Sequence, residues 1–219
     1  LYSAGGRSEV IASSFISNAC RMGAHPYTPD ASRAYGGALN LGSGELLLSN
    51  SLVAENGLSV SRNPDYRGAG LYVAGGVATI VNTTIVNNTH QAIYQAGGSV
   101  TVLNSILFFN NSSAAQIAGT VTATYSAIQN GYAGEGNIST NPILNDLYGI
   151  VLPSPAIDAG NPGLEYEDNF PPGQGTSTND MGYTGGPDAI FSALSNAGPN
   201  QYVDERTTVL LDGTVSADL

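Results

Sequence analysis

A recurring pattern of short alternating apolar and polar segments, each followed by an Asn or Gly, constrains the fold of this 219-residue chain most strongly. Five stretches share the pattern. Aligned on Ser13, Asn50, Asn82, Asn104 and Tyr125, they follow one another at steps of 37, 32, 22 and 21 residues. A unit of about 22 residues cannot bury an apolar face alone, so successive units have to stack. Asn and Gly tolerate the left-handed backbone at the corners. The pattern therefore predicts an all-β stack of short strands.

Two arrangements of such strands fit the pattern. In a solenoid, aligned Asn side chains can hydrogen-bond along the stack, and we expect such a structural ladder from Asn50, Asn82 and Asn104. A β-sandwich built from hairpins is the alternative, because the strand spacing alone would allow it. The Asn register and the two nearly equal last steps favour the solenoid.

The repeats resemble the rungs of right-handed parallel β-helix proteins. Gly-Gly-Ala-Leu at residues 36–39 and Phe-Ile-Ser-Asn at residues 15–18 also resemble the GGA[ILV] and FxxN motifs of polymorphic outer-membrane proteins and related adhesins. The resemblance implies a right-handed parallel β-helix of about 5–7 rungs over residues 1–140, from an extracellular or cell-surface protein. It implies little about function, because this fold hosts lyases, polygalacturonases, adhesins and phage tailspikes.

Charge is distributed very unevenly along the chain. Residues 1–67 contain five acids and five Arg, and residues 68–134 contain no Asp, Glu, Lys or Arg. Residues 135–219 contain twelve acids and one Arg, so the whole net charge of −11 lies there. Without a basic patch we expect no nucleic-acid partner. No apolar run reaches the roughly 18 residues of a membrane-spanning helix.

The C-terminal third contains two further segments. Residues 141–196 include Ser-Pro-Ala-Ile-Asp-Ala-Gly-Asn-Pro at 154–162 and resemble the closing segment of secreted β-helix proteins, which we expect to cover the open end of the solenoid. Residues 197–219 resemble the first strands of a PKD-like β-sandwich module but are too few to form one. We therefore expect a piece of a larger multidomain chain, with other domains as partners and a disordered or docked tail.

Two insertions lengthen the first repeats, after Asn18 and after Asn56, and should emerge at the same corner of adjacent rungs. Tyr rings can stack on sugars and Arg can pair with uronate carboxylates, so these loops predict a saccharide site. The alternative is that the charged residues form surface ion pairs that pin the loops. The ligand-binding candidates are Arg21, His25, Tyr27, Asp30, Arg33, Tyr35, Arg62, Asp65, Tyr66 and Arg67.

Acidic residues in the Pro- and Gly-rich C-terminal loops form a second candidate site. Oxygen ligands clustered in loops suit Ca²⁺, although no EF-hand spacing is present and the acids could simply be solvated. His25, His90 and the single Cys20 show no transition-metal spacing. The metal candidates are Asp158, Glu165, Glu167, Asp168 and Asp180.

The sequence is compatible with three functions. The first is a non-enzymatic surface or secreted module for adhesion, carbohydrate contact or assembly. The second is a polysaccharide lyase or glycoside hydrolase acting on an acidic polysaccharide, with His25 or an Arg as the base. The uncharged middle of the chain and the lack of a three-Asp cluster argue against it. The third is a fibre-forming subunit that associates end to end.

Overall fold

The structure is a computed structural model that describes residues 1–22, 33–60, 65–111 and 115–190, and these residues form an all-β fold with mostly parallel sheets. The largest sheet, sheet A, has eight strands: β1 (Tyr2–Ile11), β5 (Leu39–Ser49), β9 (Leu71–Val73), β10 (Val77–Val81), β12 (Ile93–Gln95), β13 (Ser99–Leu103), β15 (Ile117–Ala118) and β16 (Thr122–Thr124). Sheet B has five strands: β2 (Ser14–Ile16), β6 (Leu52–Ala54), β11 (Thr84–Val86), β14 (Ile106–Phe108) and β17 (Ala127–Ile128).

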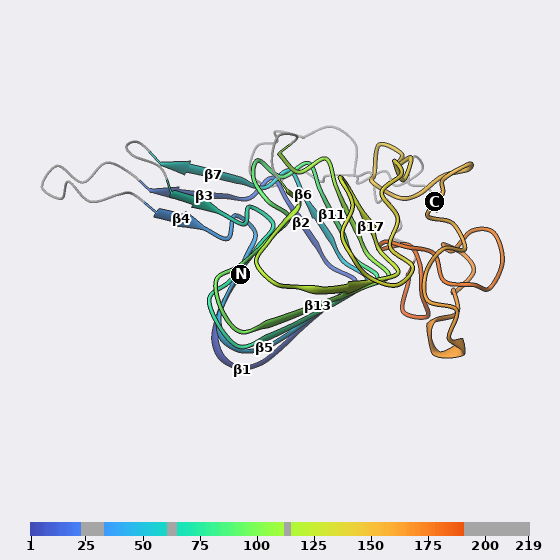
Figure 1. Cartoon of the computed structure of the whole chain (residues 1–219), viewed down its shortest axis with the longest axis horizontal. Coiled ribbons are helices and arrows are strands. Elements are labelled where there is room, and N and C mark those ends of the chain that lie inside the picture. Colours follow the sequence, from blue (N-terminus) through green and yellow to red (C-terminus); the bar gives the residue numbers. More distant parts are fainter. Residues whose placement is uncertain (23–32, 61–64, 112–114, 191–219) are drawn as a thin grey trace, which may run out of the picture.

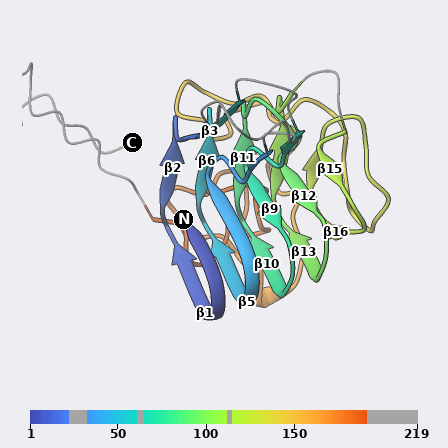
Figure 2. The ribbon, with the colours of Figure 1, turned by 90° about the vertical axis from the view of Figure 1, so that its left-hand side faces the viewer.

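Equivalent strands of successive repeats lie side by side (Figures 1 and 2). β10 pairs with β13 along its whole length, and Ile85 of β11 is opposite Leu107 of β14, both at the 22-residue step of the sequence. The corner before each sheet B strand has a left-handed backbone, with φ of 43°, 41° and 52° at Asn50, Asn82 and Asn104. The expected all-β fold with parallel strands is confirmed. The one helical element among the described residues is the short 3₁₀ turn η1 (Leu164–Tyr166), and no described helix could span a membrane.

Sheets A and B enclose one apolar core. Side chains alternate between the two faces of a strand, so every second residue points inward. The inward residues of sheet A, such as Ile80 and Leu48, pack with those of sheet B, such as Ile85 and Leu107, and all four are fully buried. At the end of the stack that follows β16 and β17, Tyr132 packs against this core and donates its hydroxyl to the Val121 carbonyl at 3.0 Å.

The C-terminal segment lies beside the stack, which differs from the expectation that it covers an open end. Ile150, Ala156 and Met181 pack against Ile106 and Phe108 on the outer face of sheet B. That outer face is apolar, and exposing it to water would be unfavourable. The end of the stack is already closed around Tyr132. Figure 1 shows the segment, in yellow to orange, flanking the strands of sheet B. The PKD-like stretch at residues 197–219 lies outside the described residues.

The asparagines expected to form the ladder bind the C-terminal segment instead. Asn50 Nδ2 donates to Gly185 O at 2.6 Å, and Asn104 Oδ1 accepts from the Asn161 amide at 2.8 Å. Asn82 Nδ2 donates to Asn179 Oδ1 at 3.0 Å, and the one contact between the three asparagines is a 3.5 Å bond from Asn104 to Asn82. The cause is the position of their corner, which faces the neighbouring segment.

A continuous amide ladder runs along the next corner, after each sheet B strand. Each side-chain Nδ2 donates to the amide oxygen of the next member, at 2.9, 2.9, 2.7 and 2.8 Å. The same oxygens also accept the backbone N–H of the preceding member, so every rung of the ladder is bonded twice. The members are Asn18, Asn56, Asn88, Asn110 and Gln116.

Candidate functional site

The two insertions form an arm that projects from the body (Figure 1). β3 (Ala19–Met22) pairs with β7 (Gly57–Val60), and β4 (Arg33–Tyr35) pairs with β8 (Asp65–Arg67), both in parallel. A small apolar cluster of Ala34, Leu58 and Ala69, with Cys20 and Tyr66 against it, holds the base of the arm. The insertions therefore emerge side by side. The candidates His25, Tyr27, Asp30 and Arg62 lie outside the described residues.

Strand alternation sorts the side chains of the arm onto two faces. Arg33 is opposite Asp65, and Tyr35 is opposite Arg67, while Ala34 and Tyr66 between them point the other way. Ala34 is fully buried in the cluster at the base of the arm, so the four polar residues face outward. Four of the predicted ligand-binding residues therefore share one face.

This outer face continues onto the body through a stack of tyrosines. The ring centroids of Tyr35 and Tyr72 are 4.6 Å apart, and those of Tyr72 and Tyr94 are 5.8 Å apart, with both pairs nearly parallel. The guanidinium carbon of Arg67 lies 5.2 Å from the Tyr35 centroid and 5.0 Å from the Tyr94 centroid, a cation–π geometry. We call this cluster the Tyr–Arg face; it comprises Arg33, Tyr35, Asp65, Arg67, Tyr72 and Tyr94. Tyr72 is only 8% exposed, because Tyr35 and Tyr94 stack on it.

Asp65 organises the Tyr–Arg face. Its Oδ1 accepts from Arg67 Nε at 2.8 Å, and its Oδ2 accepts from the Tyr35 hydroxyl at 2.6 Å. The Arg67 hydrogen bond, followed by that from Tyr35, lowers the pKa of Asp65, and the same contact with Asp65 raises the pKa of Arg67. Burial and the hydrogen bond to Asp65 raise the pKa of Tyr35. At neutral pH Asp65 is therefore a fixed carboxylate, Arg67 a fixed guanidinium and Tyr35 a neutral phenol.

Tyr72 and Tyr94 were missing from the predicted site. A signal was present, because the two residues are 22 positions apart and lie directly opposite each other in β9 and β12. Each is the middle residue of its three-residue strand, so the two occupy the same place in consecutive repeats. A search for Tyr at equal repeat positions would have found them.

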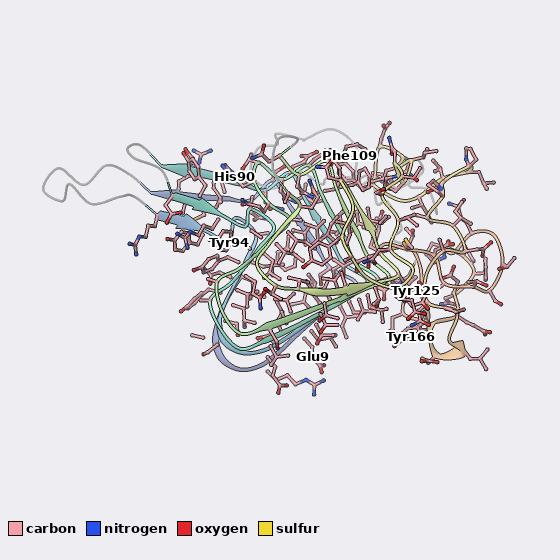
Figure 3. The ribbon with its side chains drawn as sticks, viewed as in Figure 1. Glu9, His90, Tyr94, Phe109, Tyr125 and Tyr166 are labelled. Atoms are coloured by element: carbon pink, nitrogen blue, oxygen red, sulfur yellow. The ribbon has the colours of Figure 1, made fainter. Side chains whose placement is uncertain are left out.

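The remaining described candidates on the arm lie elsewhere. Arg21 is an exposed residue of β3, opposite Ser59. Tyr66 packs against His90, with ring centroids 4.5 Å apart, and burial lowers the pKa of His90. In Figure 3 the labels of His90 and Tyr94 lie on the two sides of the base of the arm. Tyr66 therefore anchors the arm and does not join the Tyr–Arg face.

Three of the five predicted metal candidates come together, but as hydrogen-bond acceptors within the C-terminal segment. Asp180 accepts the amides of Asp158 and Gln174 at 2.8 and 2.7 Å, and Asp168 accepts that of Asp180 at 3.0 Å. Among the residues that the structure describes, no group of three or more His, Cys, Asp or Glu side chains is arranged to hold a metal ion. The exposed Glu165 and Glu167 take no part in these bonds, and calcium binding stays a prediction.

Burial and the nearby Asp168 and Asp158 raise the pKa of Asp180 to about 7. Between about pH 4 and pH 7 the folded chain therefore holds a proton that the unfolded chain has lost, so stability present at low pH is lost as the pH rises through 7. Between pH 4.5 and 7.5 we expect the free energy of unfolding of the native chain to fall by about 2 kcal/mol more than that of Asp180→Asn. This difference is smaller than the binding of one full proton would give, because the neighbouring carboxylates share the titration.

Reversible urea unfolding across this pH range measures the effect. The exposed Asp188, in the same segment, provides the control, and Asp188→Asn should keep the slope of the native chain. An unchanged slope in Asp180→Asn would show that Asp180 does not bind the proton.

Comparison of the chain with protein-family models, curated proteins and solved structures finds no match. The geometry of the Tyr–Arg face and the charge around it are therefore the features that point to a function.

Proposed function

We propose that this chain is a right-handed parallel β-helix module of an extracellular or cell-surface protein, and that it binds acidic glycans without cleaving them. The in-register pairing of successive repeats and the motifs of the sequence support the β-helix. The resemblance of the repeats to secreted rungs supports the location. The Tyr–Arg face is the single observation that carries the binding function.

The Tyr–Arg face combines the two groups that recognise an acidic sugar. Tyr rings present large rigid surfaces at a low cost in conformational entropy. A guanidinium forms charge-assisted, often bidentate, hydrogen bonds to carboxylates and sulfates. The contact with Asp65 engages the Nε of Arg67, and a guanidinium has further N–H donors. The face is therefore ordered by its own contacts before a ligand arrives, which reduces the entropy lost on binding.

The charge of the arm favours an anionic ligand. Of the four described arginines, Arg21, Arg33 and Arg67 lie on the arm strands, and only Arg7 lies elsewhere. Asp65 is the one acid on the arm strands among the described residues. The arm is thus locally positive in a chain with a net charge of −11. A positive field attracts an anionic polymer to the arm, whereas the acidic C-terminal segment repels it.

The chemistry of the same residues favours binding over cleavage. A glycosidase needs a protonated carboxylic acid beside an ionised carboxylate. Asp65 is kept ionised by its two hydrogen bonds, and the described arm strands contain no second acid to act as the proton donor. A lyase base must release its proton, but the contact with Asp65 raises the pKa of Arg67. Both charged groups are therefore set in the protonation state that suits recognition.

Isothermal titration with oligogalacturonates and with neutral oligosaccharides of equal length tests the proposal. We expect binding of the acidic series, weaker at high salt, and a loss of about tenfold or more in affinity in Arg67→Ala, since one charge-assisted hydrogen bond contributes roughly 1.5–3 kcal/mol. Arg7→Ala, which removes an exposed arginine far from the arm, should bind like the native chain. Equal affinity for both series, or cleavage of the acidic oligomers, would contradict the proposal.

A further inference from the structure

The row of tyrosine rings on the body of the chain ends at Tyr94. Tyr72 in β9 lies opposite Tyr94 in β12, and the residue opposite Tyr94 in the next strand, β15, is Ala118. Figure 2 shows these three strands side by side. Ile93 and Ile117, which precede Tyr94 and Ala118, are buried in the core, so the side chains of Tyr94 and Ala118 point outward. The next position of the row therefore carries a methyl group where a ring would continue the stack.

The two faces of the Tyr94 ring have different surroundings. Tyr72 stacks on the ring with centroids 5.8 Å apart, and the guanidinium carbon of Arg67 lies 5.0 Å from the Tyr94 centroid. Both residues belong to the repeat before Tyr94, so they approach from the same side. Ala118 belongs to the repeat after it, and one methyl group is too small to cover an aromatic ring. Tyr94 and Ala118 are each partly exposed, so the second face of the ring looks onto a step in the surface.

We propose that this step is a second subsite of the Tyr–Arg face, in which one sugar ring of the glycan stacks on Tyr94 above Ala118. The proposal rests on the glycan binding proposed above. The C–H groups on one face of a pyranose form an apolar surface that packs on an aromatic ring. Neighbouring strands lie about 4.8 Å apart. A ring at the level of β15 would therefore lie at a stacking distance from Tyr94, as the rings of Tyr35 and Tyr72 do at 4.6 Å.

The position of the subsite requires a ligand with more than one sugar. Arg67 lies on the opposite side of the Tyr94 ring, so a single sugar cannot contact both Arg67 and the second face of Tyr94. Two sugars of the same chain can, with an anionic sugar at Arg67 and another sugar on Tyr94. The ligand class is therefore the interior of an acidic polysaccharide chain, and a lone acidic sugar at the end of a glycan would fill only half of the site.

The subsite selects a ring and not a charge. Tyr94 and Ala118 lie in residues 68–134, which contain no Asp, Glu, Lys or Arg. A sugar in this subsite is therefore recognised by stacking alone, whereas the negative charge of the ligand is recognised at Arg67. The uncharged repeats, which argue against a catalytic site, suit such a contact because they attract no competing ion.

A ring introduced at position 118 tests the subsite. NMR titration compares galacturonate with trigalacturonate, and the native chain should bind the trisaccharide at least about tenfold more tightly, since only the trisaccharide fills both subsites. Ala118→Tyr continues the row of rings and occupies the step. This variant should bind the trisaccharide no more tightly than the monosaccharide, and its affinity for the monosaccharide should equal that of the native chain.

Ala133→Tyr makes the same change at an exposed position next to Tyr132, at the closed end of the stack, and should bind both sugars like the native chain. Circular dichroism checks that each variant is folded. Ala118→Leu covers Tyr94 with a smaller side chain and should weaken trisaccharide binding in the same direction.

Two results would overturn the subsite and leave acidic-glycan binding in place. The first is equal affinity of the native chain for the two sugars, and the second is native affinity for the trisaccharide in both Ala118 variants. If the native chain bound neither sugar, the proposed function would be refuted together with the subsite.

Discussion

Replacing Asn88 with Ala should destabilise the chain by roughly 4 kcal/mol, which is one of the two largest effects we expect from a single substitution. Asn88 is 2% exposed and lies in the middle of the amide ladder. Its Nδ2 donates to Val53 O at 3.0 Å and to Val86 O at 3.1 Å, and its Oδ1 accepts the Asn56 amide at 2.8 Å. Ala would leave the Asn56 N–H without its acceptor and would remove the side-chain donor from Val53 O, Val86 O and Asn110 Oδ1, at about 1–3 kcal/mol for each buried group left unpaired before relaxation. Val86 O keeps its bond from the Glu55 amide.

Asn18 provides a matched control, because it belongs to the same ladder and differs in burial. It is exposed, so water can replace its bonds to Asn56, and Asn18→Ala should cost no more than about 1 kcal/mol. Urea unfolding followed by circular dichroism compares the two variants. Equal losses of stability in the two variants would contradict the proposal that burial of the amide ladder stabilises the chain.

The amide ladder also shows what the sequence could and could not predict. The repeat at Asn82 and Asn104 predicted parallel strands with left-handed corners, because backbone conformation is a local property that Asn favours. The partner of each side chain is not local. Asn50, Asn82 and Asn104 face a segment more than 50 residues away in the chain, while Asn56 and Asn88 face each other. Both corners carry Asn, so residue type alone could not distinguish them.

The candidate site was predicted in part for a similar reason. The lengths of the two insertions located the arm, because extra residues at one corner of adjacent repeats must emerge together. The sequence could not show that Asp65 would bind Tyr35 as well as Arg67, since the contact with Tyr35 depends on the pairing of β4 with β8. Tyr72 and Tyr94 lie outside the insertions, and their part in the face appears only when the arm is placed against the body.

The acidic C-terminal segment was expected to close the stack, and it instead covers a side. The contacts of the segment explain this lateral position. The segment binds the Asn corner through carbonyls and covers Phe108 with Met181 and Ile150, so its apolar residues are used for packing. Its carboxylates bind their own backbone amides, as at Asp180 and Asp168. A charged loop region can therefore act as a lateral cover when its charges are satisfied locally.

Replacing Gly76 with Ala should cost roughly 3–4 kcal/mol, the other large effect. Gly76 has φ of +81° at the bend between β9 and β10, and it lies between Gly44 and Gly98 of the neighbouring repeats, which also have positive φ. An added Cβ would overlap the Gly44 carbonyl oxygen and lie 2.8 Å from the Gly44 nitrogen. These atoms belong to the backbone of a paired strand and cannot turn aside, so the repeats would have to separate.

Gly131 separates the clash from the strain of the backbone, because it also has φ of +81°. An added Cβ there would meet only the Ser139 Cβ, at 3.9 Å, which is an ordinary contact. Gly131→Ala should therefore cost only the left-handed strain of about 1 kcal/mol. Thermal and urea unfolding of the two variants should differ by 2 kcal/mol or more. Equal losses of stability in the two variants would contradict the close backbone contact between Gly44, Gly76 and Gly98 of neighbouring repeats.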